Sequence, residues 1–166
     1  MSTPTDTRAR WLSDTQQQVW RAWLMVTARL PMALGRQFSE HGLSSPDYQI
    51  LVGLTDVPSG RRRVSDLAQG MAWERSRISH QVKRMEARGL VERVGCDSDA
   101  RGAFVAITAQ GRRLIEETAP EHASLVRDLV FDHLTEEELA ALDAITRKVL
   151  DRLEQGPCRG VSVEDV

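Results

Sequence analysis

The sequence predicts a mainly α fold, in which a winged helix-turn-helix with a small β-hairpin wing is flanked by N- and C-terminal dimerisation helices. Three observations support this prediction. The segment from Arg63 to Thr108 has the pattern of a short helix, a turn, a second helix and two strands. Stretches on both sides of it carry apolar residues every three or four positions, which is typical of amphipathic helices. The low aromatic content of 5% also favours helix over sheet.

Five parts are expected along the 166-residue chain. The N-terminus (1–12) and the tail (155–166) are polar and lack periodicity, so we expect both to be disordered. We expect an N-terminal dimerisation helix at 13–43, the winged helix-turn-helix module at 44–109 and C-terminal dimerisation helices at 110–154. The whole chain is long enough for one domain with its own core.

The first long helix begins near Ser13 or Asp14, because either residue is a good N-cap, and extends to about Glu40. Its apolar residues recur at Val19, Trp23, Val26, Leu30, Leu34 and Phe38. An interior proline removes a backbone donor, so Pro31 predicts a kink or a break between Thr27 and Pro31. The segment is apolar on more than one face, because it also contains Trp11, Trp20, Trp23 and Met25. We do not expect the core of one subunit to bury all of them, which predicts burial against a partner.

The next helix is expected to start with Ser45 as its N-cap and Pro46 at its first helical position. Its predicted buried side consists of Tyr48, Ile50, Leu51 and Leu54. A turn at 56–60 follows, and we interpret the three arginines at 61–63 as a connector that can reach phosphate. Ser65 is then expected to cap the first helix of the module.

The second helix of the module carries two contrasting faces. At about 100° per residue, Ile78, Val82 and Met85 share one stripe, whereas the opposite stripe holds cations and short polar groups. Such a helix fits the major groove of DNA. Gly89 can end it in a left-handed conformation. The residues predicted to contact DNA from this module are Arg63, Ser65, Arg75, Ser76, Arg77, Ser79, His80, Lys83 and Arg84.

The predicted wing consists of strands at 90–94 and 103–108, with a charged loop between them. Arg101 at its tip is a candidate for insertion into the minor groove, where a narrow groove concentrates negative potential. Asp99 would repel DNA if it were unpaired, so we infer that it orients Arg101 or another arginine. Both residues complete the predicted DNA-contacting set.

Charge is distributed unevenly along the chain, although its net value is only −2. The segment 59–101 holds ten Lys and Arg residues against six Asp and Glu residues, and the remainder holds twelve against eighteen. A basic module on an acidic body is compatible with a polyanionic partner, because the body is repelled while the module is attracted. Double-stranded DNA is the partner that this distribution favours.

Several other classes of protein are disfavoured by the sequence. Two cysteines and a polar N-terminus fit a cytoplasmic protein, and no apolar run approaches the length of a membrane span. A phosphate-binding glycine loop, a nucleophile constellation and paired carboxylates are all missing, so we expect no enzymatic activity, no catalytic residues and no cofactor. The four histidines lie in separate segments and are expected to be solvated rather than to bind metal: His41, His80, His122 and His133.

Two alternatives stay open from the residues alone. Cys96 at the base of the wing could oxidise, which would make this a thiol-based redox-responsive regulator, although nearby carboxylates disfavour a thiolate. The module could instead bind protein without reading DNA. A related ambiguity concerns Trp20, Trp23 and Met25, which could line a pocket for an aromatic ligand or form part of a core.

The chain resembles the MarR family of bacterial transcriptional regulators. The residues that carry this resemblance are 64–68, 82–91, the Asp99-Ala100-Arg101 sequence and 105–111. The resemblance covers about 13–153. It implies a cytoplasmic homodimer with interleaved first and last helices that binds a pseudo-palindromic operator, often as a repressor that a small, commonly aromatic, ligand releases.

Two features depart from the family pattern. Trp73 and Glu74 lie where the recognition helix begins, and we predict that Trp73 packs between the two module helices rather than against a base. The first helix also contains no cysteine. In the peroxide-sensing branch of the family this helix keeps a reactive thiol, so the resemblance does not extend to that branch.

Overall fold

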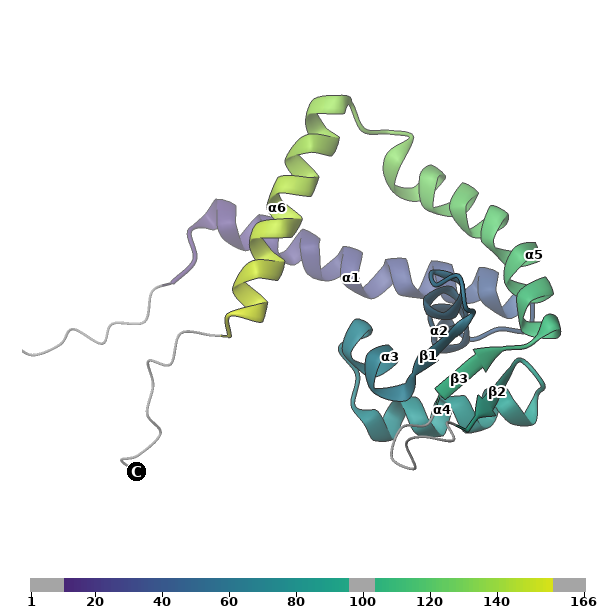
Figure 1. Cartoon of the computed structure of the whole chain (residues 1–166). Coiled ribbons are helices and arrows are strands. Elements are labelled where there is room, and N and C mark those ends of the chain that lie inside the picture. The colour runs from purple at the N-terminus through teal and green to yellow at the C-terminus, as the bar shows by residue number, and fades with distance from the viewer. Residues whose placement is uncertain (1–10, 96–103, 157–166) are drawn as a thin grey trace, which may run out of the picture. The chain divides into compact units, whose positions relative to one another are not determined.

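The fold is mainly helical with a small sheet, in agreement with the predicted fold class (Figure 1). The computed structural model describes residues 11–95 and 104–156. Its contacts divide the chain into two units, Met1–His122 and Ala123–Val166. The first unit contains α1 (Asp14–Glu40), α2 (Ser45–Thr55), β1 (Arg61–Arg63), α3 (Val64–Gly70), α4 (Arg75–Ala87), β2 (Val91–Val94), β3 (Phe104–Ile107) and most of α5 (Ala109–Val126). Helix α5 continues into the second unit.

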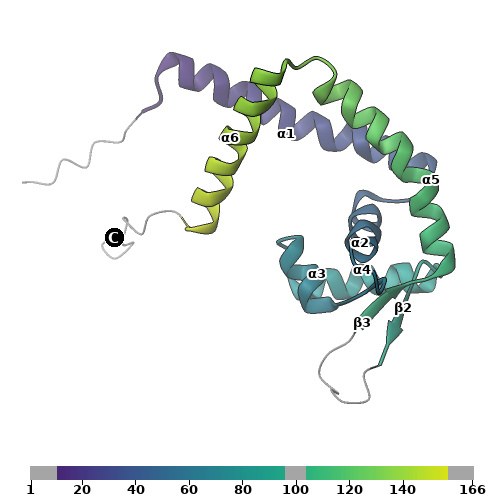
Figure 2. The ribbon, with the colours of Figure 1, turned by 45° about the horizontal axis from the view of Figure 1, so that its top comes forward.

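The three strands form an antiparallel sheet in the order β1-β3-β2. Strands β2 and β3 are the predicted hairpin (Figure 2). The interpretation of 61–63 as a connector is wrong, because Arg61 pairs with Ala106 and Arg63 pairs with Phe104. A run of three arginines has no alternation to indicate a strand, so pairing with a neighbouring backbone decides its conformation here.

The core of the first unit lies between α2, α3, α4 and the sheet. Ile78, Val82 and Met85 on α4 are completely buried, as the stripe predicted, and so are Ile50, Leu51 and Leu54 on α2. Together with β2 and β3 they hold α4 in a fixed orientation. The two ends of α4 are therefore defined by tertiary packing as well as by local sequence.

Glycine is required at two points around this core. Gly89 follows α4 with φ +72°, the left-handed conformation that was predicted. Gly111 lies in the first turn of α5, where a Cβ atom would come within 2.1 Å of the carbonyl oxygen of Leu90. Thr108 precedes that turn and accepts a hydrogen bond from the Gly111 amide at 3.0 Å. This tight contact sets where α5 leaves the sheet.

The structure confirms most of the prediction for the first long helix, α1. Ser13 is its N-cap and forms a capping box with Gln16, and the helix ends at Glu40. A break near Pro31 does not occur, since the helix is continuous from Asp14 to Glu40. A proline removes only one backbone hydrogen bond, and the remaining bonds of a long helix can maintain it.

The predicted caps of the next two helices are wrong. The N-cap of α2 is Ser44 rather than Ser45, because Ser44 and Asp47 form a reciprocal capping box. Helix α3 starts two residues earlier than expected, at Val64 with Arg63 as its N-cap, and no side chain caps it. Ser65 lies inside its first turn and donates to Oδ1 of Asp66 at 3.0 Å. Adjacent serines and short helices make such assignments ambiguous in sequence by one or two residues.

The second unit contains the end of α5, the π-helical segment η1 (Arg127–Phe131) and α6 (Glu136–Glu154). Helix α5 continues through Pro120 without interruption. Thr135 caps α6 and forms a capping box with Glu138. Apolar side chains along α6 are exposed, from 44% at Val149 to 70% at Leu153. Within the described ranges, the helices are too short or too polar to cross a membrane.

Candidate nucleic-acid interface

The outward face of α4 is polar and cationic. Its exposed side chains are Arg75, Ser76, Arg77, His80, Lys83 and Arg84, and Ser79 is half-buried. Glu86 is the one acidic residue within the bounds of α4, and its carboxylate lies 3.6 Å from Nε of Arg93 on β2. The face therefore presents four cations and several hydroxyl or imidazole groups to solvent. An anionic partner can approach it without displacing apolar side chains.

Trp73 lies immediately before α4 and supports one of these cations. Its half-buried ring packs against the module core, as predicted. The guanidinium carbon of Arg77 lies 3.8 Å from the centre of the ring, which is a close cation–π contact. This contact restricts the conformations of Arg77 at the start of the helix. A pre-ordered arginine loses less conformational entropy when it binds a base or a phosphate.

Strand β1 places its arginines on opposite faces of the sheet. The guanidinium carbons of Arg61 and Arg63 lie 5.7 and 4.8 Å from the ring centre of Phe104 on β3. Arg62 pairs with Val105, so its side chain projects from the other face, and its Nε atom is buried without a hydrogen-bond partner. Arg63 was predicted to contact DNA, but the sequence contained no sign of its contact with Phe104, because their proximity depends on strand β1, which was not predicted.

The remaining predicted DNA-contacting residues differ in position. Ser65 is half-buried at the start of α3. Asp99 and Arg101 lie outside the described residues, as does Cys96, the candidate redox cysteine. The strands at the base of the wing are described, and they adjoin α4 through a hydrogen bond of 3.4 Å from Arg93 to the carbonyl oxygen of Ser79.

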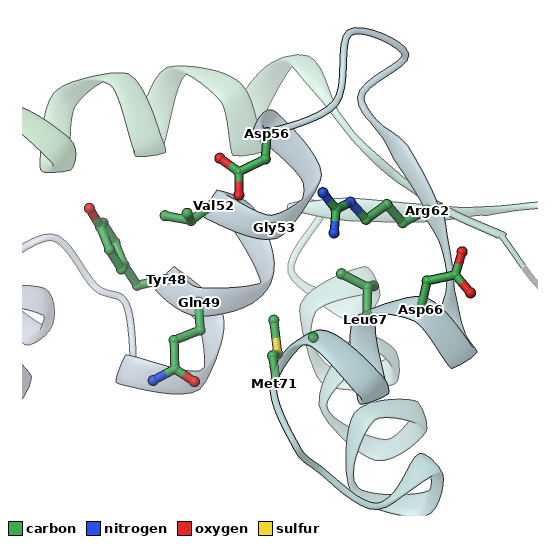
Figure 3. Close-up of a pocket in the computed structure, with 10 residues that line it drawn as sticks. Tyr48, Gln49, Val52, Gly53, Asp56, Arg62, Asp66, Leu67 and Met71 are labelled. Atoms are coloured by element: carbon green, nitrogen blue, oxygen red, sulfur yellow. The ribbon is translucent and has the colours of Figure 1, made fainter. Parts of the chain in front are cut away.

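A cavity of about 440 Å³ lies beside the module core, between α2, α3 and β1 (Figure 3). Tyr48, Val52, Leu67 and Met71 give it an apolar lining. Polar groups are contributed by Gln49, Asp56, Arg62 and Asp66. The predicted ligand residues Trp20, Trp23 and Met25 are not part of this lining and lie exposed on α1. A pocket made from three elements has no contiguous motif that sequence could reveal.

The prediction that all four histidines are solvated is wrong for His122. Its ring packs against Phe38 and Tyr48, with centroid separations of 4.9 and 4.7 Å, because α5 crosses the junction of α1 and α2. Burial lowers its pKa. His41 nearby lies 2.7 Å from a carboxylate oxygen of Glu121. Among the residues that the structure describes, no group of three or more His, Cys, Asp or Glu side chains is placed to hold a metal ion.

Comparison with known proteins places this arrangement among transcriptional regulators. Residues 41–102 match the model of the MarR family. AbsC, a MarR family transcriptional regulator from Streptomyces coelicolor, is 39% identical in sequence to this chain. Its crystal structure matches with a TM-score of 0.85, and the match covers 89% of this chain and 99% of AbsC.

Two further similar proteins are also transcriptional regulators. Sco3205, a MarR family transcriptional regulator from the same organism solved in complex with DNA, is 36% identical with a TM-score of 0.85, and the match covers 93% of this chain and 96% of that one. The transcriptional repressor MprA of Escherichia coli is 26% identical over 144 residues, which are 87% of this chain and 81% of MprA.

Proposed function

Because the chain belongs to the MarR family of transcriptional regulators, we propose that it binds a pseudo-palindromic operator as a homodimer and reads each half-site with α4. The observation that supports this most strongly is the exposed face of α4, which carries four cations and no large apolar side chain. A protein-binding face would be expected to offer apolar anchors. We assign the protein to the cytoplasm, where bacterial DNA lies, and assign it no enzymatic activity.

Within α4, the residue types suggest a division of roles. Arg77 can donate two hydrogen bonds to the O6 and N7 acceptors of guanine, while Ser76, Ser79 and His80 can act at short range in the groove. Lys83 and Arg84 suit phosphates, which fix the register of the protein on the duplex. For the wing we retain Arg101 as the minor-groove residue and Asp99 as its orienting partner.

The homodimer is supported by the apolar side chains that a single copy leaves exposed. On α1 these include Trp20 at 50%, Val19 at 63% and Val26 at 56%, and on α6 they include Ile145 at 53%. Surfaces of this kind usually mark an interface. Dimers bind half-sites that are centred about 10 bp apart, or one helical turn, on one face of the duplex.

We also propose that the protein is a repressor released by a small ligand, a mode of regulation typical of the family. The cavity between α2, α3 and β1 is the site we favour for that ligand. Its apolar lining suits an aromatic group, and the unpaired Nε of Arg62 suits an anionic substituent. Trp20, Trp23 and Met25 remain the alternative ligand-binding residues.

Binding to a duplex from the promoter region of the gene itself tests the DNA-binding proposal. We expect the logarithm of affinity to fall steeply and linearly with the logarithm of salt concentration. Arg77→Ala should reduce the free energy of operator binding by about 1–3 kcal/mol and relax the preference for one base pair. Lys83→Ala should weaken binding to all DNA sequences equally and lower the salt slope by about 1. Arg101→Ala should weaken operator binding while leaving the dimer intact.

Arg113→Ala provides the matched control, because it removes the same charge from an exposed position on α5. It should change neither the base preference nor the salt slope. If Arg77→Ala and Arg113→Ala behaved alike, α4 would not be the reading helix. Affinity without salt dependence in the wild-type protein would contradict DNA binding altogether.

A further inference from the structure

A buried carboxylate joins the recognition helix to the start of α2. Asp47 is 1% exposed, and one of its oxygens, Oδ1, accepts a hydrogen bond from Nε2 of Gln81 at 2.7 Å. Its other oxygen, Oδ2, accepts from Nη1 of Arg88 at 2.8 Å, and from the backbone N–H and the hydroxyl of Ser44 at 2.9 and 2.8 Å. Asp47 thus links the capping box of α2 to two residues from the segment of α4.

Arg88 extends this network to the end of α1. The same guanidinium that binds Asp47 donates a second hydrogen bond to the carbonyl oxygen of Gly42, in the loop between α1 and α2. Gln81 and Arg88 are seven residues apart, which is two turns or about 10 Å along a helix. Both side chains bond to the Asp47 carboxylate, and Arg88 also bonds to Gly42, so these contacts restrict the position of α4 against the start of α2 and the loop that follows α1.

Capping alone does not require this arrangement. Ser44 and Asp47 would complete their box without Gln81 or Arg88, and an apolar residue at 81 could fill the same buried space. Burying an ion pair adds little stability compared with apolar packing, although removing one partner is costly. Directional bonds, by contrast, specify one orientation. The network therefore fits a role in setting geometry more closely than a role in adding stability.

The carboxylate is ionised under ordinary conditions. Burial by itself would raise the pKa of Asp47, but the hydrogen bonds from Ser44, Arg88 and Gln81 together outweigh burial and hold that pKa below its usual value. All the groups that contact the carboxylate are donors. The network therefore persists over the neutral pH range in which DNA binding would be measured.

We propose that Asp47 and Arg88 are positioning residues for DNA recognition, which fix α4 against the end of α1 and so set the half-site spacing that the dimer accepts. This inference rests on the proposed function, since it needs two copies of α4 on one operator. Neither residue has to touch DNA. Their effect passes through the orientation of α4, so it should appear as a loss of discrimination between operators.

The test uses operators whose half-sites are separated by the preferred spacing or by one base pair more or less. Wild-type protein should reject both altered duplexes. Asp47→Asn and Arg88→Ala should each reduce this discrimination by about 10- to 100-fold, the range of coupling energies within one network. Affinity for non-specific DNA at low salt should stay within about twofold, since phosphate contacts are kept.

Two measurements separate positioning from other roles. If Arg88 contacted phosphate, Arg88→Ala would lower the salt slope by about 1, whereas a positioning residue leaves the slope unchanged. The double variant Asp47→Asn with Arg88→Ala should discriminate no worse than the more affected single variant, because both break one network. Arg93→Ala is the matched control, since Arg93 bonds to α4 at Ser79 but not to α2. It should keep wild-type discrimination.

Circular dichroism and thermal unfolding would confirm that each variant is folded. Arg88 is 43% exposed, so Arg88→Ala tests the inference even if Asp47→Asn does not fold. The inference is overturned if a folded Arg88→Ala keeps wild-type discrimination, or if its salt slope falls. Failure of the wild-type protein to bind any spaced operator would instead overturn the proposed function, so the two failures are distinguishable.

Discussion

The winged helix-turn-helix module and the long terminal helices differ sharply in how their apolar residues are used. In the module, Ile78, Val82 and Met85 are 0% exposed and lie in one continuous core. By contrast, Trp11, shortly before α1, is 87% exposed, and Val19 on α1 is 63% exposed. Helix α1 contributes only Gln37 and Phe38, near its C-terminal end, to the buried residues.

This difference shows which part of the molecule buries its apolar side chains within a single copy. The module satisfies its own hydrophobic surface, so its fold is determined within a single chain. The helices α1 and α6 do not, which supports their role in dimerisation. The DNA-reading surface is therefore built by one subunit, whereas the distance between two such surfaces depends on the association of two subunits.

A charge on the exposed stripe of α1 should produce the largest effect. We expect Trp20→Glu to weaken dimerisation by about 2–4 kcal/mol, or roughly 30- to 1000-fold, because an aromatic interface anchor is lost and a carboxylate is introduced. The module should remain folded. Sedimentation velocity over a concentration series measures the dimer equilibrium, and circular dichroism measures the fold.

Gln18→Glu is the control for this change. It introduces the same charge on the side of α1 opposite Trp20, where Arg29 and Arg36 also lie on a helical projection. Its dimer should match the wild-type dimer. If Trp20→Glu left the dimer unchanged, α1 would not supply the interface, and the contrast with the module would need another explanation.

Within the module, Gly111 offers the opposite kind of test. Gly111→Ala would place a methyl group 2.1 Å from the carbonyl oxygen of Leu90, a backbone atom that cannot move aside easily. We expect the free energy of unfolding to fall by about 1–3 kcal/mol. Gly70→Ala is the control, since a Cβ atom there meets nothing within 4 Å and the residue is helical.

Chemical denaturation of both glycine variants measures these changes. Gly70→Ala should be neutral or stabilising by up to about 1 kcal/mol, because alanine is the better helix former. Equal stability of Gly111→Ala and Gly70→Ala would mean that α5 does not leave the sheet as tightly as the structure indicates.

The smallest effect concerns pH and the junction of α1, α2 and α5. Burial lowers the pKa of His122 in the folded protein, so the unfolded chain binds a proton more readily there. Stability from this group is present above the ordinary histidine pKa of about 6.5 and is lost as pH falls through and below that value. His122→Phe keeps an aromatic ring against Phe38 and Tyr48 without a titratable group.

Melting temperatures between about pH 5 and pH 8 would reveal this contribution. The wild-type protein should lose stability on acidification with a steeper slope than His122→Phe. Since His41 and Glu121 form a close pair at this junction, His41→Gln is measured in parallel to separate their pair from His122. Identical slopes for wild type and His122→Phe would show that His122 is not a buried neutral group.

Sequence predicted the features of this fold that repeat along the chain. The buried stripe of α4, the left-handed Gly89 and the Ser13 cap of α1 each have a local pattern, and the structure confirms them. The charge pattern likewise indicated which face of α4 is polar. Local physical chemistry, namely helical periodicity and capping, is sufficient for these features.

Features that depend on contacts between distant segments were missed. Strand β1 exists because the backbone of 61–63 pairs with β3, and its three arginines contain no signal for this. The bonds of Asp47 to Gln81 and Arg88 join residues 34 and 41 positions apart, so no local pattern indicated them. His122 was assigned to solvent because the two aromatic rings that cover it come from α1 and α2.

The most direct test of this account is the stoichiometry of the protein on DNA. Sedimentation of the full chain with an operator duplex should give two chains per duplex, and a duplex that carries one half-site should bind far more weakly. Two symmetrical footprints centred about 10 bp apart should accompany that complex. One chain per duplex, with equal affinity for the single half-site, would contradict the central claim. That claim is that each subunit folds its own DNA-reading module, and that the apolar helices α1 and α6, which one copy leaves exposed, associate to place two such modules on the operator.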